Sequence, residues 1–460
     1  MPSYSSIKKH LHLFHKIKRI QEKAPLMVLI IAGVIGTITG IIGVMFQYAV
    51  NWVISIRKLL ILHLFDNIWL TYLAIFCITG AMGLFAYYLV ERWAPESGGS
   101  GIPEIEGALM NLRPVRWRYV LPVKFIGGLG ALGSGMVLGR EGPTVQIGGN
   151  VGAMICDLLK IKNIAYRHTF LATGAAAGIT AAFNAPLAGI LFIIEEMRPQ
   201  FRYSLTSIKA IFVGVIMASI MYQFLFNQTS VFQIGHFNAV PIQSLWLYLI
   251  LGALFGGIGV ISNKCILLMQ DRYRQFYQRK SYNFLATGFL LAGIFGVTSF
   301  ILPEITGSGF DFIPDATFGK YAIGTLFLIL LMRFITTVLC FSSGAPGGIF
   351  APTLALGTTI GIVFGLFTQQ IFPNYRIELG ACAIIGMGGL FAATVRAPLT
   401  GIVLVMEMSD NYQLILPMII TCLGATLIAQ ALGGVPLYSA ILERILLRSK
   451  SVEAEKTEQT

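Results

Sequence analysis

Charge is scarce in this sequence. Only 12% of the 460 residues are Asp, Glu, Lys or Arg, about half the charged fraction of an average soluble domain. Apolar residues make up 55%, and 50 glycines are scattered among them. This combination favours a polytopic membrane protein over a soluble domain.

Motifs for metal binding and catalysis are missing as well. The six cysteines stand far apart, no CxxC occurs, and no histidine lies at metal-ligand spacing from a cysteine. We expect free apolar cysteines and neither a metal nor another cofactor. The sequence has no HExxH, no paired intramembrane aspartates and no serine–histidine pair. An intramembrane enzyme is therefore disfavoured.

What the sequence does contain is long uncharged runs, each suited to a bilayer helix of about 20 residues. The clearest are Leu26–Val50, Ile68–Val90, Leu171–Ile194, Leu245–Ser262 and Leu414–Leu442. Further apolar runs, which raise the expected total to ten or more segments, lie near 206–225, 284–302, 321–331, 353–371 and 377–395. The first run lacks a small-residue cleavage site, so we expect it to be retained as a span.

The net charge of +12 is concentrated in short connections between these runs. Excess Lys and Arg in short loops marks the cytoplasmic side of a membrane protein. We therefore expect both termini in the cytoplasm, a lipid bilayer around the chain and no nucleic-acid partner. The basic clusters are Lys8–Lys23, Arg113–Arg118, Arg198–Arg202, Arg272–Lys280 and Arg444–Lys450.

The second half of the chain repeats parts of the first. Three pairs of segments recur in the same order and at a nearly constant spacing: Gly99–Gly101 with Gly307–Gly309, Gly139–Pro143 with Gly348–Pro352, and Ala185–Glu195 with Ala397–Glu407. Such repeats are typical of transporters, whose sites form between broken helices near the bilayer midplane. They predict an all-α membrane protein with two structurally related halves in an inverted repeat.

The repeat suggests the domain organisation. A basic segment (1–25) precedes the first half (26–225) and the second half (226–440), and a short cytoplasmic tail (441–460) follows. The polar part of the tail after Lys450 is expected to be disordered.

Prolines interrupt the apolar runs at matching places in the two halves. Asn184-Ala185-Pro186 and Arg396-Ala397-Pro398 each predict a helix break, because proline lacks a backbone donor and clashes with the preceding turn. After Pro143, the stretch Thr144–Cys156 is too short to span the hydrocarbon, since a helix rises by only about 1.5 Å per residue. It predicts a re-entrant half-helix. Irregular backbone cannot face lipid, so these breaks should line a cavity.

Glycines beside prolines predict helix starts with free N–H groups. Such donors, together with the positive end of the helix dipole, suit an anion. The four predicted starts are Gly98–Pro103, Gly139–Pro143, Gly344–Gly348 and Gly348–Pro352. If they converge, they form a cage of N–H groups. Glycines without a neighbouring proline are expected to serve close helix packing instead: Gly148, Gly149 and Gly152.

Three of these stretches resemble the signature sequences of the CLC chloride channels and transporters, in the family's order. They are Gly99-Ser100-Gly101-Ile102-Pro103, Gly139-Arg140-Glu141-Gly142-Pro143 and Gly348-Ile349-Phe350-Ala351-Pro352. The likeness runs from about Leu26 to Tyr438. It implies a homodimer in the bacterial inner membrane, with one anion pathway per subunit and bound chloride as substrate. The family's large regulatory C-terminal domain is not expected, since only a short tail follows Tyr438.

The resemblance also implies an anion site. Ser100 and Tyr438 would direct hydroxyl groups at a central chloride, and the N–H groups of Ile349 and Phe350 would complete its shell. Each has a plainer alternative: Ser100 could cap a helix, Tyr438 could be an interfacial tyrosine, and Phe350 could be a core side chain. A serine at position 100 favours chloride, because the resemblance associates proline there with nitrate.

Glu141 resembles the family's external gating glutamate. Deprotonated, it would occupy the outer end of the pathway and exclude chloride; protonated, it would be neutral and swing away. An ion pair with Arg140 is the alternative, although adjacent residues at a helix start point in different directions. An intramembrane ionisable residue is a functional candidate by default.

Glu196 resembles the internal proton acceptor, but Glu195 and Glu196 together could simply mark a helix end. The repeat separates them, because Glu195 aligns with Glu407 while Glu196 aligns with Met408. An acid shared by both halves suggests architecture, and the acid peculiar to one half suggests proton transfer. Three further ionisable residues are given only a structural or supporting place: Glu106, Lys124 and Arg396.

The leading functional prediction is exchange of chloride for protons, with Glu141 on both paths and Glu196 on the proton path. A passive chloride channel of the same fold is the alternative; family channels tend to have an apolar residue at the position of Glu196. A cation transporter would instead need converging carboxylates and carbonyls.

Overall fold

The computed structural model of the chain describes residues 4–62, 67–197, 204–226, 231–232 and 234–458. The basic cluster Arg198–Arg202 lies outside the described residues, as do the side chains of Lys8–Lys23. Across the described part the regular structure is helical, and one isolated bridge between Gly139 and Gly348 is the β-type pairing. The all-α prediction is confirmed.

The helices form two series in the same order. The first series is α1 (Tyr4–Leu62), α2 (Ile68–Arg92), α3 (Ile102–Leu109), α4 (Trp117–Gly133), α5 (Glu141–Leu158), α6 (Ile164–Phe183), α7 (Pro186–Glu196) and α8 (Leu205–Phe226). The second series is α9 (Leu245–Arg279), α10 (Asn283–Ile301), α11 (Phe312–Thr317), α12 (Ile323–Ser342), α13 (Phe350–Ile371), α14 (Leu379–Val395), α15 (Pro398–Ser409) and α16 (Ile415–Ala431). A last helix, α17 (Leu437–Glu458), follows.

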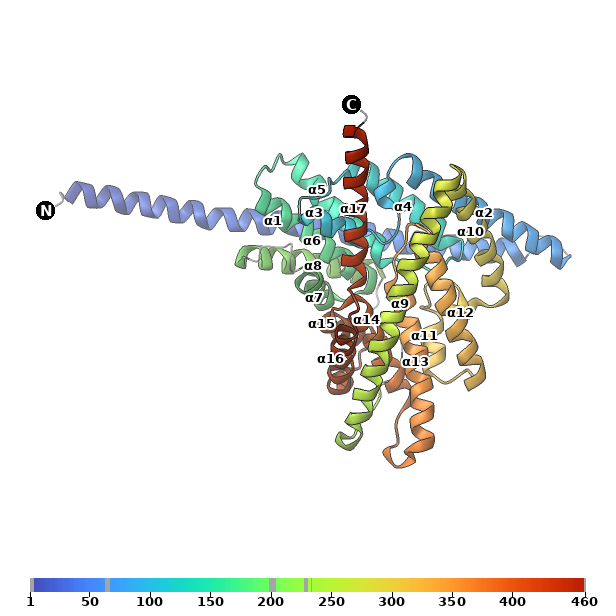
Figure 1. Ribbon diagram of the computed structural model, residues 1–460. Helices are drawn as coiled ribbons and strands as arrows, with labels where there is room; N and C mark the ends of the chain where they lie inside the picture. Colours follow the sequence, from blue (N-terminus) through green and yellow to red (C-terminus); the bar gives the residue numbers. More distant parts are fainter. Residues whose placement is uncertain (1–3, 63–66, 198–203, 227–230, 233, 459–460) are drawn as a thin grey trace.

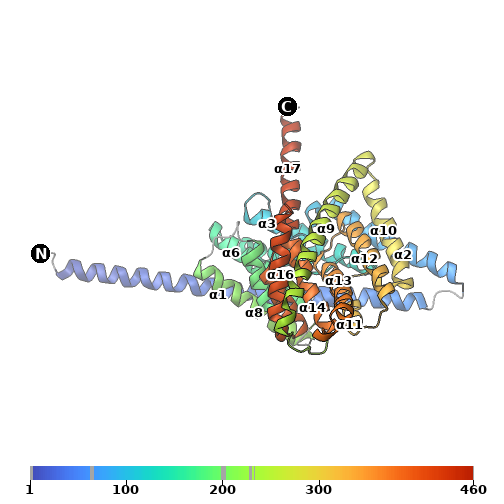
Figure 2. The same cartoon turned by 60° about the horizontal axis from the view of Figure 1, so that its bottom comes forward.

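Helix pairings repeat between the series. In the first series α1 packs on α8 and α5 on α6; in the second α9 packs on α16 and α13 on α14. The pairs α2–α10 and α7–α15 join the two series. After the second series the chain returns as α17, drawn in red, which contacts α3 of the first series (Figures 1 and 2). The predicted pair of related halves is confirmed.

Many of these helices suit a membrane. Eight described helices are long and apolar enough to cross one, and two shorter apolar helices are α14 and α15. Their outer faces expose large apolar side chains, among them Trp52, Leu73, Leu249 and Leu427. Such continuous apolar exposure fits a lipid surface. Four cysteines are buried, Cys265 is half-buried and Cys77 is exposed, and all six are free thiols.

The two predicted helix breaks are confirmed. Asn184 separates α6 from α7 with a left-handed φ of 49°, and Arg396 separates α14 from α15 with a φ of 71°. Pro186 and Pro398 are the first residues of α7 and α15. Proline fits this position because its missing N–H would lack an intrahelical partner in any case.

Three details differ from the predictions. Helix α5 has 18 residues, more than the predicted Thr144–Cys156, because it starts at Glu141, where a first-turn proline needs no N–H donor, and it ends at Leu158. Gly344–Gly348 starts no helix: it forms an irregular loop whose backbone pairs with two other loops. The expected disorder after Lys450 was wrong for 451–458, where the backbone continues α17.

The glycines without neighbouring prolines do serve packing. A Cβ on Gly148 would lie 2.0 Å from the carbonyl oxygen of Gly174, and one on Gly152 would lie 2.2 Å from that of Phe170. The second half repeats this contact between Gly357 and Gly386, at 2.3 Å. α5 and α6, and likewise α13 and α14, are therefore held too close for any side chain between them.

Candidate functional site

Three glycine-containing loops meet in the middle of the molecule. Gly139 and Gly348 donate their N–H groups to each other's carbonyls, at 2.8 and 2.7 Å. The N–H of Gly99 donates to the carbonyl of Ala345, and that of Gly347 to Gly99, both at 3.1 Å. The convergence that the cage requires is present, and it brings the starts of α3, α5 and α13 together.

The expected cage of free N–H groups is only partly present. The N–H groups of Gly99, Gly139, Gly347 and Gly348 bond to carbonyls of neighbouring loops, so they cannot serve an anion. The predicted cage was wrong at these four amides, because the loops lie side by side and their backbones bond to one another. The N–H that meets a charged oxygen is that of Phe350, at the start of α13.

Glu141 provides that oxygen. Its side chain is fully buried, and Oε1 accepts a hydrogen bond from the Phe350 N–H at 2.6 Å. Oε2 has no hydrogen-bond partner among the described residues. A Cβ on Gly139 or on Gly348 would lie 2.1 or 2.3 Å from the carboxylate oxygens, so only glycine leaves room for them. The carboxylate thus lies at a helix N-terminus, where an anion is stabilised.

Arg140 points away from Glu141. Its guanidinium carbon lies 4.6 Å from the centroid of the Phe310 ring. With the Gln47 amide oriented to suit both partners, Oε1 of Gln47 accepts from Nη1 at 2.7 Å and from Nη2 at 3.2 Å. No ion pair joins Arg140 to Glu141 in the described part of the chain. The ion-pair alternative for Glu141 is therefore wrong.

Ser100 and Tyr438 are both buried and lie close enough for their hydroxyls to interact with each other, yet the described residues provide no well-formed hydrogen bond to either one. Ser100 does not cap α3, whose N-cap residue is Gly101. The Ser100 hydroxyl lies beside the start of α5, since a Cβ on Gly142 would be 2.7 Å from it. Tyr438 lies in the first turn of α17, with its ring 5.9 Å from that of Phe350. A buried hydroxyl without a partner calls for a ligand or water.

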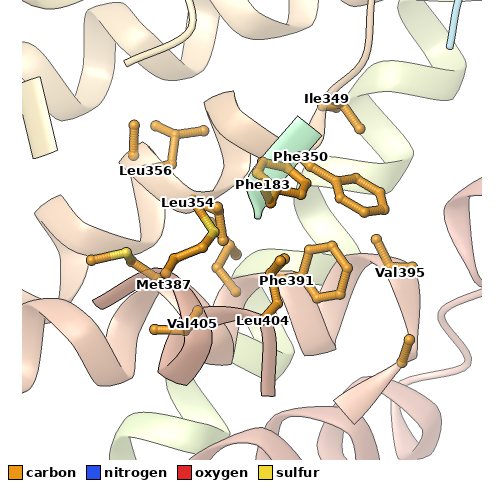
Figure 3. Packing of buried hydrophobic residues seen from close by; sticks show 14 of the residues in the cluster. Phe183, Ile349, Phe350, Leu354, Leu356, Met387, Phe391, Val395, Leu404 and Val405 are labelled. Carbon is orange, nitrogen blue, oxygen red and sulfur yellow. The ribbon is translucent and has the colours of Figure 1, made fainter. Parts of the chain in front are cut away.

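Phe350 contributes to the site and to the core at once. Its ring packs against those of Phe391 at 4.6 Å and Phe183 at 6.3 Å (Figure 3). It also lies 5.7 Å from the ring of Phe192. Ile349, the N-cap residue of α13, is buried beside it. The aromatic packing fixes the first turn of α13 and so the direction of the Phe350 N–H.

A buried lysine supports the Ser100 loop. Lys124 Nζ donates to the carbonyls of Ser97 at 2.9 Å and Gly99 at 2.6 Å. Arg333, on α12 of the second series, donates in the same way to the carbonyls of Glu304, Thr306 and Gly307. The sequence marked Lys124 as a charge in an apolar run, but the carbonyl partners are set by long-range packing.

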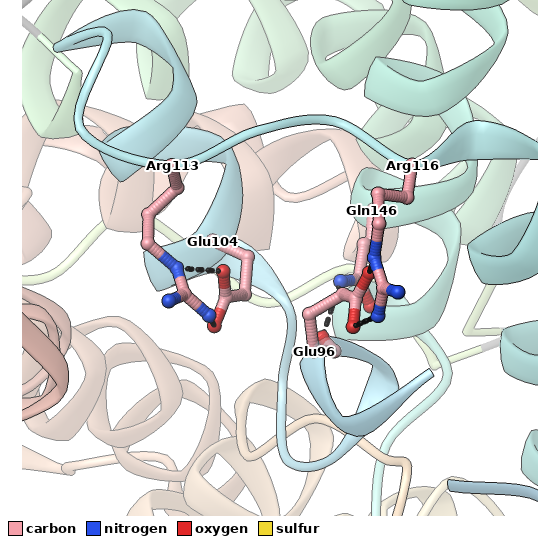
Figure 4. Close-up of polar contacts among 5 residues, drawn as sticks. All are labelled: Glu96, Glu104, Arg113, Arg116 and Gln146. Carbon is pink, nitrogen blue, oxygen red and sulfur yellow. Dashed lines mark hydrogen bonds and ion pairs between the residues drawn. The ribbon is translucent and has the colours of Figure 1, made fainter. Parts of the chain in front are cut away.

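Ion pairs hold the outer ends of the same loop (Figure 4). Arg116 binds both carboxylate oxygens of Glu96 at 2.6 Å, and Arg113 binds those of Glu104 at 2.8 and 3.0 Å. The Glu96 hydrogen bonds raise the pKa of Arg116. Gln146 of α5 donates to the Glu96 carbonyl at 2.7 Å. The segment between η1 (Pro95–Ser97) and α3 is thereby fixed on both sides of Ser100.

Glu195 and Glu407 form reciprocal caps between the halves. Glu195 accepts from the N–H groups of Leu399 at 3.0 Å and Thr400 at 2.6 Å, at the start of α15. Glu407 accepts from those of Leu187 at 2.9 Å and Ala188 at 2.8 Å, at the start of α7. Each acid satisfies amides that a helix start leaves unpaired. The shared acid is architectural, as the repeat predicts.

Glu196 differs from Glu195. It ends α7 with 7% of its surface exposed, and its Oε1 has no hydrogen-bond partner in the described part of the chain. It interacts electrostatically with Glu106, whose Oε1 accepts from the Ser439 hydroxyl at 3.4 Å. The described residues contain no cluster of three potential metal ligands.

Comparison with known proteins places this architecture in a class. The family model for voltage gated chloride channels matches residues 82–430. The chain therefore belongs to that family, the CLC channels and transporters, whose members are transport proteins.

Two curated relatives are H(+)/Cl(−) exchange transporters ClcA. The one from Salmonella arizonae is 54% identical over 440 residues, which cover 96% of this chain and 93% of the relative. The one from Salmonella paratyphi B is 54% identical over 445 residues, 96% of this chain and 94% of the relative.

Comparison with solved structures also finds proteins of this family. A slow cyanobacterial Cl⁻/H⁺ antiporter superposes with a TM-score of 0.88 at 39% identity, over 92% of this chain and 99% of that one. A eukaryotic CLC transporter has the same fold, with a TM-score of 0.77 at 22% identity, over 91% of this chain and 74% of that one.

Proposed function

We propose that the protein exchanges chloride for protons in opposite directions across the membrane, as the relatives' names describe for those proteins. One observation carries the proposal: a buried carboxylate, Glu141, accepts the N–H of Phe350 at the N-terminus of α13. A carboxylate that holds an anion site competes with a halide when ionised and leaves the site when protonated. Anion binding and proton binding are thereby linked at one side chain.

Four further residues complete the proposed pathways. Ser100 and Tyr438 offer buried hydroxyls to chloride, together with the first amides of α13 at Ile349 and Phe350. Such fixed donors replace part of the ion's hydration shell, and neutral donors bind weakly enough for release. Glu196 carries the proton at the other end, because it is a buried acid whose neighbour Glu195 is already committed to capping. Chloride and protons are substrates, and no cofactor is needed.

The same proposal extends to the setting of the protein. A bacterial inner membrane, both termini in the cytoplasm and a homodimer follow from the family and from the basic clusters in short connections. Site-specific labelling of cysteines introduced near each terminus would test the sidedness. Light scattering of the purified protein would test the dimer.

Paired chloride and proton fluxes on purified protein in liposomes test the exchange itself. Under a proton gradient, an exchanger shifts the reversal potential away from the chloride equilibrium potential. The alternative, a passive chloride channel, would give a potential that depends on chloride alone. Such a result would exclude exchange, and insensitivity to replacing chloride by gluconate would exclude anion transport altogether.

A further inference from the structure

A cavity of about 190 Å³ lies against the second copy of the Gly-Ser-Gly loop. Among its lining residues are Ile54 and Arg57 of α1, Leu132 of α4, and Ser308. Gly307 and Gly309 flank Ser308 with left-handed φ angles of 61° and 94°. The corresponding φ angles beside Ser100 are 65° and 87°, so the two loops have the same backbone shape.

Arg57 is the unexplained group in this cavity. Only 8% of its surface is exposed, yet Nε and Nη1 have no hydrogen-bond partner among the described residues. Arg57 is also absent from every ion pair found in the described part of the chain. A buried guanidinium with two unbonded N–H groups is costly unless a ligand or water accepts them.

The guanidinium lies next to the Ser308 loop. A Cβ on Gly135 would be 2.7 Å from Nη1 of Arg57, and the Gly135 carbonyl accepts the N–H of Gly307 at 3.1 Å. The Ser308 hydroxyl accepts the N–H of Phe310 at 3.4 Å. A hydroxyl that accepts can still donate its own hydrogen.

Arg57 is not needed to hold the Ser308 loop in place, because Arg333 already binds the carbonyls of that loop. Arg333 is fully buried and donates to the carbonyls of Glu304, Thr306 and Gly307 at 3.1 to 3.4 Å. It corresponds to Lys124, which supports the Ser100 loop. The Ser100 loop has one such buried cation beside it, whereas the Ser308 loop has two: Arg333 from the second half and Arg57 from the first.

We propose that this cavity binds a small monovalent anion such as chloride, with one of the unpaired N–H groups of Arg57 and the Ser308 hydroxyl as donors. The site is separate from Ser100 and Tyr438 and goes beyond the exchange proposed above. Other charges at the lining limit the ligand's charge. Lys58 and Asp311 are exposed, Glu304 is half-buried and Asp315 pairs with Lys320. The three lining carboxylates repel any anion, and they repel a divalent anion about twice as strongly as a monovalent one, which favours the monovalent class.

Bromide soaked into chloride-free crystals tests the site, because its anomalous signal identifies it. We expect a bromide peak within hydrogen-bond distance of the Arg57 guanidinium in the wild-type protein. Arg57→Gln should lose this peak and keep any peak near Ser100. Lys58→Gln, a matched loss of charge at the same cavity, should keep both. A wild-type protein without bromide at Arg57, or an Arg57→Gln peak equal to that of the wild type, would overturn the proposal.

A concentration series separates the effect of charge from that of donor position and covers the case in which Arg57→Gln does not fold. Arg57→Lys keeps the charge but shifts the donor and removes the planar guanidinium, so half-occupancy should need about tenfold more bromide. Sulfate that displaces bromide at Arg57 at equal concentration would contradict the monovalent class. Bromide occupancy at Arg57 is measured independently of proton coupling. A result against this site would therefore leave the exchange proposal intact, and a result against exchange would leave this site intact.

Discussion

In the first half, helix α5 begins with Glu141; at the matching place in the second half, α13 begins with Phe350. The carboxylate of Glu141 accepts the N–H of Phe350, so the two matching helix starts are joined directly. Their preceding glycines, Gly139 and Gly348, form a symmetric pair of hydrogen bonds. The backbones of the halves are thus alike at the site, and their side chains differ.

Other matching positions of the two halves can be compared in the same way. Glu195 and Glu407 cap each other's half, and Lys124 and Arg333 each bind loop carbonyls. These matched residues hold the structure. Glu196 has no acidic counterpart, since Met408 stands in its place. Among the acidic residues, Glu195 and Glu407 match between the halves and build the scaffold, whereas Glu141 and Glu196 have no acidic counterpart and are the candidates for proton transport.

The largest effect is expected from removing the charge that distinguishes Glu141. Glu141→Gln imitates the protonated side chain and weakens its hold on the Phe350 N–H. Proton movement should fall to the level of protein-free vesicles, while chloride movement persists. Paired flux measurements in liposomes check this. Proton uptake driven by a chloride gradient in this variant would contradict the role of Glu141.

The second largest effect on transport is expected for Glu196→Gln. We expect chloride flux to continue and proton flux to be lost, because the variant cannot bind and release a proton at this position. Glu407→Gln is the matched control: it neutralises an acid of the second half that is assigned to capping, and it should keep proton coupling. Equal loss of coupling in both variants would break the distinction between matched and unmatched acids.

Close glycine contacts test the scaffold. Gly148→Ala and Gly357→Ala each force a methyl group against a backbone carbonyl, at 2.0 and 2.3 Å, and should each cost about 1–3 kcal/mol of unfolding free energy. Gly257→Ala in α9, where a Cβ would meet no atom within 4 Å, should be neutral or stabilising by up to about 1 kcal/mol. Thermal unfolding in detergent measures all three. A cost confined to one half would argue against an equivalent scaffold.

The smallest effects are expected at the reciprocal caps. Glu195→Ala and Glu407→Ala each leave two helix-start amides without a carboxylate and should cost about 1 kcal/mol. The same unfolding measurement applies, and the double variant should show the sum. A clearly larger cost for one of them would show that the two caps are not equivalent.

Local sequence features were sufficient to predict the breaks at Asn184 and Arg396 and the glycine loops themselves, whereas the meeting of these loops was stated only as a condition. Proline and glycine act through their own backbone, so their effect is visible in a short stretch. The pairing that uses up the amide of Gly99 was missed, because its partner, Ala345, lies far away in the second half of the chain. For the same reason the sequence marked Lys124 as unusual and could not name its acceptors.

In the hydrogen bond between Phe350 and Glu141, the carboxylate of the chain itself accepts the N–H group that a halide would otherwise accept. The amide at the tip of α13 is satisfied as soon as the two halves come together, whatever salt is present outside. Folding and storage of the protein should therefore tolerate buffers free of chloride, and a chain without this carboxylate would depend on the surrounding electrolyte to fill the same position.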